Sequence, residues 1–365
     1  MRRNPKEFRD GAQDGLVPLA PLDINQIKDF DELLAGYSRT AFGGRSLGEA
    51  AEVLETMLLD PDCTRVGTFA GAMTVAKMGL LICEMIDRGW LQIIISTGAL
   101  MAHGLIEAVG QVHYKYDPRR SDEELYRMGY NRVYDTLEME SNLDYAEGIF
   151  KQVLDGLDPH QTFASATICR ELGRYLAEHT DQPGILRNAY LKGVPVFIPA
   201  FTDSELGLDL ANWMIERSLK RGQSVRQALT TMNLNFNPFL DLGLYAQQVM
   251  DAKKLGIFTI GGGVPRNWAQ QVGPFFDILQ NRLGVTLPFV RFHYGVRICP
   301  EPVHWGGLSG CTYREGISWG KFVPENEGGR FAEVYCDATI AWPILVKAVA
   351  QRLAKRQPEG APNRV

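Results

Sequence analysis

A nearly continuous run of β-branched residues, Leu91 to Thr97, limits most strongly what this chain can fold into. Such a run has no polar face for solvent, so it is typical of a parallel strand that is buried on both sides. Val66–Phe69, Val194–Ile198 and Gly256–Ile260 are shorter segments of the same kind, and each precedes a turn and a helix. Repeated strand–helix units predict an α/β fold of the Rossmann-like kind, in which helices cover both faces of a parallel sheet.

The helices between these strands have recognisable starts. A capping-box spacing, Ser-x-x-Glu, opens a helix predicted over residues 46–59. The apolar spacing predicts further helices over residues 73–88 and 98–109. Ser121 is followed by three acidic residues, which indicates another helix start. We therefore expect a helical insertion over residues 120–190, between the second and third strands.

No linker or internal repeat divides the 365 residues. We therefore expect residues 19–350 to form a single domain. A domain of this length can bury a core large enough to be stable without a disulfide or a metal. Residues 1–18 are polar and contain glycine and proline, so we expect a mobile N-terminal arm. Residues 351–365 are basic and contain proline, so we expect a flexible tail.

The composition argues against several classes of function. The net charge of −5 does not favour nucleic acid as a partner. No run of about 18 apolar residues predicts a membrane span, and no apolar segment follows Met1-Arg2-Arg3 as a secretory signal requires. The six cysteines form no Cys-x-x-Cys pair and none lies at zinc spacing from a histidine. We therefore expect no bound metal and a reduced, cytoplasmic location.

Polar and glycine-rich residues follow the expected strands. Thr97 ends the Ile-rich strand, Asp203 follows the next strand, and Gly261–Gly263 follow the strand after that. Ligands of open α/β sheets collect at the carboxyl ends of the strands, and a glycine-rich turn before a helix gives a phosphate access to free N–H groups. Since no GxGxxG motif is present, a tight strand–helix turn is an equally good interpretation of the glycines. Asp203 and Asp337 can likewise be interpreted as helix N-caps.

A lysine beside a tryptophan occurs late in the chain, in Ser318-Trp319-Gly320-Lys321, with Glu315 three residues before it. A lysine becomes a nucleophile when part of it is neutral, and burial against an aromatic face lowers its pKa by penalising the charged form. Such a lysine attacks an imine or carbonyl carbon and carries a covalent intermediate. The indole face also attracts ammonium groups. By itself the tetrapeptide is more typical of a surface turn.

Four motifs in combination are much more specific. The chain resembles the deoxyhypusine synthase family in Thr202-Asp203, in Gly261-Gly262-Gly263-Val264, in the segment Glu315 to Lys321, and in Val334-Tyr335-Cys336-Asp337-Ala338. The motifs occur in the family's order and at similar spacings, and the resemblance runs from about Phe30 to about Val349. It implies a fold of the Rossmann-like kind that binds NAD. The residues that match cofactor positions of the family are Thr97, Asp203, Gly262, Gly263 and Asp337.

The resemblance also implies a transfer reaction that is redox-neutral overall. NAD takes hydride from the secondary amine region of spermidine, and the lysine matched by Lys321 attacks the resulting imine. Diaminopropane leaves, an acceptor amine takes over the aminobutyl group, and the retained NADH reduces the new imine. Trp319 would face the methylenes and cations of the polyamine, and Glu315 would pair with an ammonium. Family members are tetramers with sites at dimer interfaces, which implies a homotetramer here.

The chain departs from the family pattern where a polyamine should be held. Leu208 stands in place of an aspartate, although Asp209 is next to it, and Asn267 stands in place of a histidine. Trp305 and Leu308 stand at two acidic positions. Because each desolvated ammonium needs a partner, these losses weaken a site for a polycation. We expect altered substrate handling rather than lost chemistry, with Asn267 and Asp209 among the substrate-binding residues.

Further substitutions lie near the expected cofactor, and other polar residues could take over the lost contacts to the polyamine. On the cofactor side, Gly71-Ala72 replaces a Ser-Asn pair of the family. Glu205, Glu301 and His304 are candidates to replace the lost polar partners, although His304 is more typical of a loop histidine that is already satisfied.

Four functions remain open from the sequence. The first is transfer of an aminobutyl group from spermidine or putrescine to a small amine such as putrescine, which gives homospermidine. The second is deoxyhypusine synthase activity, in which a lysine of a translation factor is the acceptor. The third is a non-catalytic regulator that binds NAD or polyamine, and the fourth is a family enzyme that acts on another amine. Retention of Glu315, Trp319 and Lys321 argues against the third, and the lost carboxylates favour the first over the second.

Overall fold

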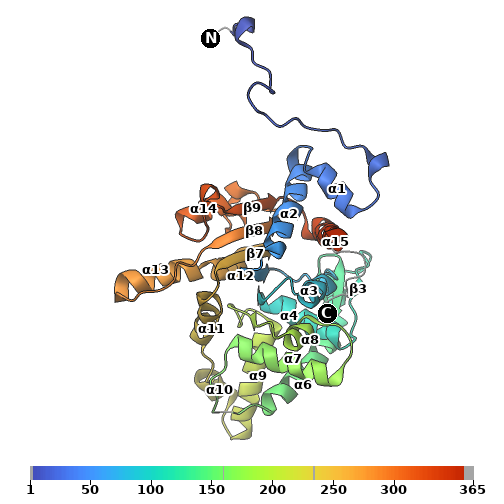
Figure 1. Ribbon diagram of the computed structural model, residues 1–365. Coiled ribbons are helices and arrows are strands. Elements are labelled where there is room, and N and C mark those ends of the chain that lie inside the picture. Colours follow the sequence, from blue (N-terminus) through green and yellow to red (C-terminus); the bar gives the residue numbers. More distant parts are fainter. Residues whose placement is uncertain (1–2, 159, 233–234, 357–365) are drawn as a thin grey trace.

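The centre of the computed structural model, which describes residues 3–158, 160–232 and 235–356, is a six-stranded parallel sheet (Figure 1). The strand order is β6-β2-β1-β7-β8-β9, and every neighbouring pair is parallel. The predicted α/β fold is confirmed, together with all four predicted strands. The strands of this sheet are β1 (Cys63–Phe69), β2 (Ile93–Ser96), β6 (Val196–Phe197), β7 (Lys254–Ile260), β8 (Phe292–Ile298) and β9 (Arg330–Val334).

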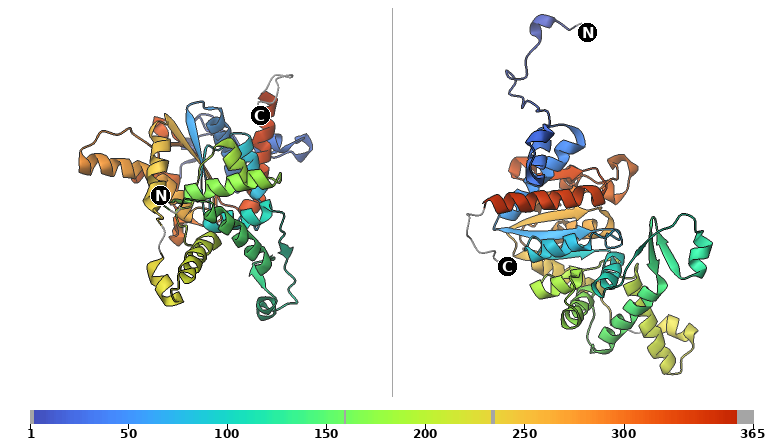
Figure 2. Two further views of the ribbon diagram at one scale, coloured as in Figure 1. Left: turned by 90° about the horizontal axis from the view of Figure 1, so that it is seen from below. Right: turned by 90° about the vertical axis from the view of Figure 1, so that its right-hand side faces the viewer.

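Helices cover both faces of this sheet (Figure 2). One face carries α2 (Phe42–Leu59), α3 (Gly79–Asp87), α4 (Gly98–Ala108) and α15 (Ala338–Arg356), and the other carries α11 (Pro238–Met250), α12 (Gly263–Gln270) and α13 (Val272–Leu283). On β2, Ile94 belongs to the first hydrophobic core, whereas Ile93 and Ile95 belong to the second. The period of two in a strand thus places successive isoleucines in two different cores.

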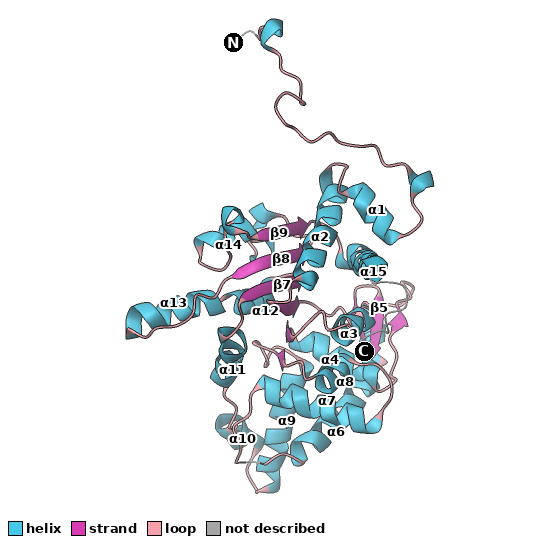
Figure 3. Cartoon of the chain, viewed as in Figure 1, coloured by secondary structure: helices cyan, strands magenta, loops and turns pink. Residues whose placement is uncertain are grey.

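The predicted helical insertion is confirmed in α5 to α8, but the segment after α4 also contains short strands that the sequence analysis did not predict. This segment contains a small antiparallel sheet in the order β3-β5-β4, drawn in magenta at the right of Figure 3. Residues 134 and 135 form the tight turn between β4 and β5, with Tyr134 at a φ of 54°. These strands are too short to give a clear alternating pattern. The elements are β3 (Tyr114–Lys115), α5 (Asp122–Arg127), β4 (Tyr130–Val133), β5 (Thr136–Met139), α6 (Glu140–Asp155), α7 (Ser165–His179) and α8 (Ile185–Lys192).

Four further helices complete the described fold. Helix α1 (Phe30–Tyr37) precedes α2, α9 (Glu205–Lys220) and α10 (Val225–Thr231) follow β6, and α14 (Tyr313–Ser318) lies between β8 and β9. In the described part of the chain, none of the helices is both long and apolar enough to cross a membrane.

Two predicted helix starts need correction, and one is confirmed. Helix α2 begins at Phe42 rather than at Ser46. No side chain caps its first turn, so the capping-box spacing at Ser46 does not mark the start of this helix. Helix α3 begins at Gly79 rather than near residue 73, since Lys77 has a φ of 63° and interrupts the helical path. The side chain of Ser121 does cap α5, where it accepts a hydrogen bond from the backbone N–H of residue 124.

The C-terminal helix extends beyond the predicted domain boundary. Helix α15 continues to Arg356, and Arg352 pairs with Asp31 at 2.6 Å and with Glu55 at 3.3 Å. Residues 351–356 are therefore part of the fold, and the rest of the predicted tail lies outside the described residues.

At the other end, residues 3–18 project from the body as an exposed segment (Figure 1). The backbone N–H of Ala20 donates to the carbonyl of Arg39. The mobility of the arm stays a prediction, and residues 1–2 lie outside the described part.

Close packing of α1 against α2 gives a stability test. A Cβ on Gly48 would lie 2.3 Å from the backbone nitrogen of Ser38, whereas a Cβ on Gly43 of the same helix meets no atom within 4 Å. Gly48→Ala should therefore lower the free energy of unfolding by about 1–3 kcal/mol. Gly43→Ala, the matched control, should raise it by up to about 1 kcal/mol. Urea denaturation of both variants measures the difference, and equal midpoints would contradict this packing.

Candidate active site

The expected cofactor residues lie along one edge of the sheet. Because all six strands are parallel, their carboxyl ends meet there, with Thr97 after β2, Asp203 after β6, Gly262 and Gly263 after β7, and Asp337 after β9. Five spacings of about 4.8 Å between neighbouring strands spread this row over about 24 Å. The chain changes direction across the sheet between β1 and β7, which is where open α/β sheets bind ligands.

The triple glycine has a definite structural reason. Gly261 and Gly263 have φ values of 75° and 57°, which favour glycine. A Cβ on Gly262 would lie 2.5 Å from the Cα of Ser309, so only glycine lets the loop after β8 rest against the start of α12. Near Gly263 an added Cβ meets no atom within 4 Å, so the backbone at this helix start stays open to a ligand.

The alternative role of the two aspartates as N-caps holds for one of them. Asp337 Oδ1 accepts hydrogen bonds from the backbone N–H and the hydroxyl of Thr339 at the start of α15. For Asp203 the interpretation is wrong, because the side chain of Ser204 caps α9 by accepting from Gly207. The exposed carboxylate of Asp203 is therefore not the cap of this helix.

A cavity of about 320 Å³ lies between α12, residues 303–311 and α14. It brings together four of the residues that the sequence predicted for chemistry and substrate binding. These residues are Lys321, Asn267, Glu315 and Trp319.

Lys321 is the buried nucleophile candidate of this cavity, with 7% of its surface exposed. Its Nζ donates to Asn267 Oδ1 at 3.0 Å and lies 5.9 Å from the centre of the Trp319 ring. Burial lowers the pKa of Lys321, and the nearby charge of Arg266 lowers it further, while Cys311 and Glu315 act in the opposite direction. The amine is therefore neutral to a larger extent than an exposed lysine at the same pH.

Local backbone geometry fixes where this lysine lies. Gly320 has a φ of 68°, so a left-handed residue turns the chain from α14 into the next segment. The Lys321 carbonyl then accepts from the N–H of Phe292, the first residue of β8. Gly316 leaves room for Phe322, whose ring lies 2.6 Å from the position of an added Cβ.

Two buried arginines support the loop that closes the cavity, and the sequence analysis did not identify them. Arg266 Nη1 and Arg297 Nη1 donate to the carbonyl of Cys311 at 2.7 and 2.8 Å. Arg297 also pairs with Glu333 at 3.5 Å, and the Arg266 guanidinium lies 5.1 Å from the centre of the Tyr313 ring. Burial lowers the pKa of Arg266. The one sequence signal that could have identified Arg266 is its position directly before Asn267, a predicted substrate-binding residue.

The family model of deoxyhypusine synthase matches residues 32–349. The chain belongs to the deoxyhypusine synthase family. This is a family of transferases, as the resemblance of the motifs indicated.

Individual relatives agree with this assignment. The chain is 31% identical over 338 residues to "Probable deoxyhypusine synthase 2" of Methanosarcina acetivorans, which covers 92% of this chain and 90% of that protein. It is 33% identical over 350 residues to "Probable deoxyhypusine synthase 1" of the same organism, covering 96% of this chain and all of that protein. The crystal structure of a deoxyhypusine synthase homologue from Entamoeba histolytica shares the fold, with a TM-score of 0.56 at 14% identity over 90% of this chain and 96% of that chain.

The substitutions that distinguish this chain from the family pattern fall at the cavity and at α9. Leu308 lines the cavity and is 55% exposed, and Trp305 next to it is 70% exposed. Asn267 holds the Lys321 amine directly. Leu208 on α9 is 66% exposed. Apolar side chains thus face solvent at two places where the family carries carboxylates.

Asp209 does not line the Lys321 cavity. It lies on α9 beside two other carboxylates, Glu205 of the same helix and Glu147 of α6. Burial, together with repulsion from Glu147 and Glu205, raises the pKa of Asp209 to about 7. The structure of one chain therefore does not place Asp209, a predicted substrate-binding residue, next to Lys321.

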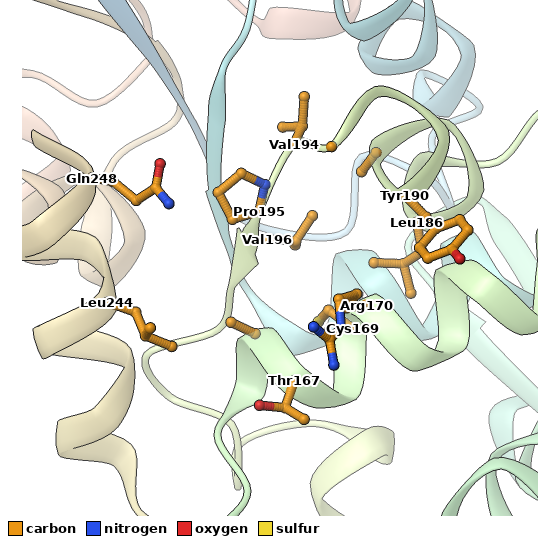
Figure 4. Close-up of a pocket in the computed structure, with 13 residues that line it drawn as sticks. Thr167, Cys169, Arg170, Leu186, Tyr190, Val194, Pro195, Val196, Leu244 and Gln248 are labelled. Carbon is orange, nitrogen blue, oxygen red and sulfur yellow. The ribbon is translucent and has the colours of Figure 1, made fainter.

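A second cavity of about 300 Å³ lies next to the edge strand β6 (Figure 4). Its lining comes from α7, α8, α11 and β6, and Arg170 and Gln248 are among its few polar side chains. None of the predicted site residues lines it.

The raised pKa of Asp209 makes the stability of the protein depend on pH. Between 3.8, the ordinary value, and about 7, the folded chain holds a proton that the unfolded chain has released. Stability from this site is present below the lower value and is lost as the pH rises through about 7. Asp209→Asn removes the effect, so its stability relative to the wild type should rise by roughly 1–2 kcal/mol between about pH 5 and about pH 8.

Urea denaturation at both pH values measures this change. Asp144→Asn, which alters an exposed carboxylate on α6, is the matched control and should show no comparable trend. A difference between Asp209→Asn and the wild type that is equal at both pH values would contradict the raised pKa.

Proposed function

We propose that this member of the deoxyhypusine synthase family uses NAD to transfer an aminobutyl group from spermidine or putrescine, through an imine on Lys321, to a small amine acceptor such as putrescine, giving homospermidine. The observation that carries the proposal is the environment of Lys321. The amine is buried, its pKa is lowered, and it lies in a cavity with an indole and a carboxylate.

Each residue of the cavity has a chemical role in this reaction. Lys321 attacks the carbon of the oxidised donor as a neutral amine, and the departing amine takes the proton that the lysine loses. Asn267 Oδ1 accepts from the lysine and so directs its lone pair. Trp319 packs against the methylene chain and the cations of the donor, and Glu315 pairs with a terminal ammonium. Water is excluded from the imine by the burial of the lysine.

NAD, when bound, supplies the hydride acceptor for the donor and returns the hydride at the end of the cycle. The residues that would hold it are those of the row at the sheet edge. The open backbone of Gly262 and Gly263 at the start of α12 suits a phosphate group, and Asp203, Thr97 and Asp337 offer hydroxyl-binding oxygens. Gly262 lies against Ser309 of the loop that borders the Lys321 cavity, which supports a cofactor site next to this cavity.

A small acceptor is favoured by what lines the cavity. Glu315 is its one carboxylate among the described lining residues, and Leu308 occupies a family acidic position. Few ammonium groups can therefore be neutralised there at once, which suits a diamine better than a longer polycation. The carboxylates Asp209, Glu205 and Glu147 would bind a second ammonium if the site is completed across a dimer interface of a homotetramer, as the family resemblance implies.

The second candidate is transfer to a lysine of a translation factor in the cytoplasm. It is supported by the names of the curated relatives. It is also supported by Trp319 at the cavity and Trp305 in the adjoining loop, which are 65% and 70% exposed and would be covered by a protein acceptor. A non-catalytic regulator would not need a buried lysine with a lowered pKa, so this alternative is less favoured.

Removal of the lysine tests the proposed mechanism. Lys321→Ala should reduce transfer by at least about 1,000-fold, because no side chain remains to carry the imine, while NAD binding stays near the wild-type value. Purified protein is incubated with NAD and spermidine, with and without putrescine, and both the polyamines and the intact protein are analysed by mass spectrometry. Lys347→Ala, at an exposed site on α15, is the control and should keep full activity.

The products separate the candidates. Homospermidine and diaminopropane establish the small-amine transferase. Diaminopropane release or a Lys321 adduct without homospermidine keeps the chemistry and points to a protein lysine or another amine. Near-normal transfer by Lys321→Ala would contradict the covalent mechanism. No turnover by the wild type would favour another amine donor or the non-catalytic regulator.

Restoring a carboxylate at the cavity tests the altered substrate handling. Leu308→Asp should lower KM for spermidine by about 3- to 10-fold, because it supplies a partner for an ammonium. Leu208→Asp should act in the same direction at α9, and Leu283→Asp, at an exposed position of α13, should not. Steady-state kinetics with spermidine give the comparison. An unchanged KM in both test variants would mean that other groups already neutralise the substrate.

A further inference from the structure

Three side chains that the proposed transfer does not use converge at one point between the main sheet and the insertion. His103 lies on α4, His113 lies in the loop after α4, and Glu138 lies on β5. Glu138 Oε2 is 3.2 Å from His103 Nδ1 and 2.5 Å from His113 Nε2. Each of the three residues offers a ligand atom that lies within 4.8 Å of the other two. Two imidazole nitrogens and one carboxylate oxygen form a ligand set that suits a first-row transition metal.

The cluster is buried, which separates it from a chance grouping of surface residues. The side chains of His103, His113 and Glu138 are 9%, 0% and 1% exposed. Buried polar atoms are nearly always hydrogen-bonded, yet His113 Nε2 makes no hydrogen bond of acceptable geometry despite its short distance to Glu138. His113 Nε2 and Glu138 Oε2 therefore approach as an ion pair, and both atoms face the same small space beside His103.

The surrounding groups orient the ligands. Asn142 Nδ2 donates to Glu138 Oε1 at 2.7 Å, which leaves Oε2 to face both histidines. This is the arrangement of an outer-shell partner that fixes a ligating carboxylate. Such partners are as much a part of a metal site as the ligands themselves.

Lys77 is the group that opposes metal binding. Its Nζ lies 2.6 Å from His113 Nδ1 and 2.7 Å from Glu107 Oε1. A histidine that binds metal through Nε2 keeps its proton on Nδ1, and this proton would face the ammonium. The Lys77 side chain is 49% exposed and already pairs with Glu107, so it can turn toward that carboxylate when a metal enters.

We infer that His103, His113 and Glu138 form a binding site for a divalent transition metal, and that zinc is the cation it takes. The three protein ligands leave a fourth position for water. Because His103 is on α4 and Glu138 is on β5, the ion joins the small antiparallel sheet to a helix of the main domain. Helix α4 starts directly after Thr97, so the same ion would steady the element that carries one of the expected cofactor residues.

Metal binding by the full-length protein tests the site directly. Protein treated with EDTA and dialysed is titrated with Zn²⁺ against a chromophoric chelator, and the thermal midpoint is measured with and without Zn²⁺. The wild type should bind about one Zn²⁺ per chain and unfold at a higher temperature when it is bound. Glu138→Gln and His113→Gln should lose this binding. His179→Gln, at an exposed histidine on α7, is the matched control and should keep it.

Two further measurements keep the result clear if a ligand variant fails to fold. Co²⁺ bound to the wild type should give the visible absorption of a low-symmetry nitrogen and oxygen site, unlike that of the hydrated ion. Lys77→Met removes the opposing ammonium and should raise the affinity for Zn²⁺ by about 10-fold. Wild-type protein that binds no more Zn²⁺ than folded Glu138→Gln, or that gives the spectrum of hydrated Co²⁺, would overturn the assignment. None of these readouts depends on transferase activity.

Discussion

Two buried guanidinium groups that share one carbonyl hold the candidate active site together. Arg266 comes from α12 and Arg297 from β8, and both donate to the carbonyl of Cys311. A buried arginine is costly unless its charge is neutralised or its N–H groups are bonded. Arg297 also pairs with Glu333, whereas Arg266 Nε and Nη2 make no hydrogen bond within the described residues, so the bond to Cys311 is what ties Arg266 to the loop after β8. That loop closes the cavity, and α14 and Lys321 follow it along the chain. The position of the nucleophile therefore depends on this pair of arginines.

The same loop connects the cavity to the expected cofactor row. Ser309 rests on Gly262, and a side chain at this glycine would push the loop away from α12. A nucleotide phosphate at the start of α12 and a substrate at Lys321 would thus both lie beside one short helix. This arrangement suits a reaction in which the cofactor acts on the donor at the beginning of the cycle and on the product at the end.

Most of the central sheet could be predicted from the sequence, because Ile93 to Ile95 and the apolar runs in β1 and β7 are buried on both faces. Strand β8 was not predicted, since His293 and the buried Arg297 interrupt its apolar pattern. The start of α2 and the small antiparallel sheet were missed for a related reason. Tertiary contacts allow a helix to begin without a cap and allow strands of four residues to pair, and neither feature leaves a periodic signal.

For the site, local motifs identified Lys321, Trp319, Glu315 and Asn267, and the fold brings these four residues to one cavity. The sequence by itself determined the family and the parallel sheet and supplied Lys321 as the proposed nucleophile, because these follow from apolar runs and from motifs of adjacent residues. Only the tertiary structure decided that Lys321 is buried, that Asp209 lies with other carboxylates away from it, and that His103, His113 and Glu138 meet. Burial and convergence depend on segments that are far apart in the chain, and no short stretch of sequence records how such segments pack.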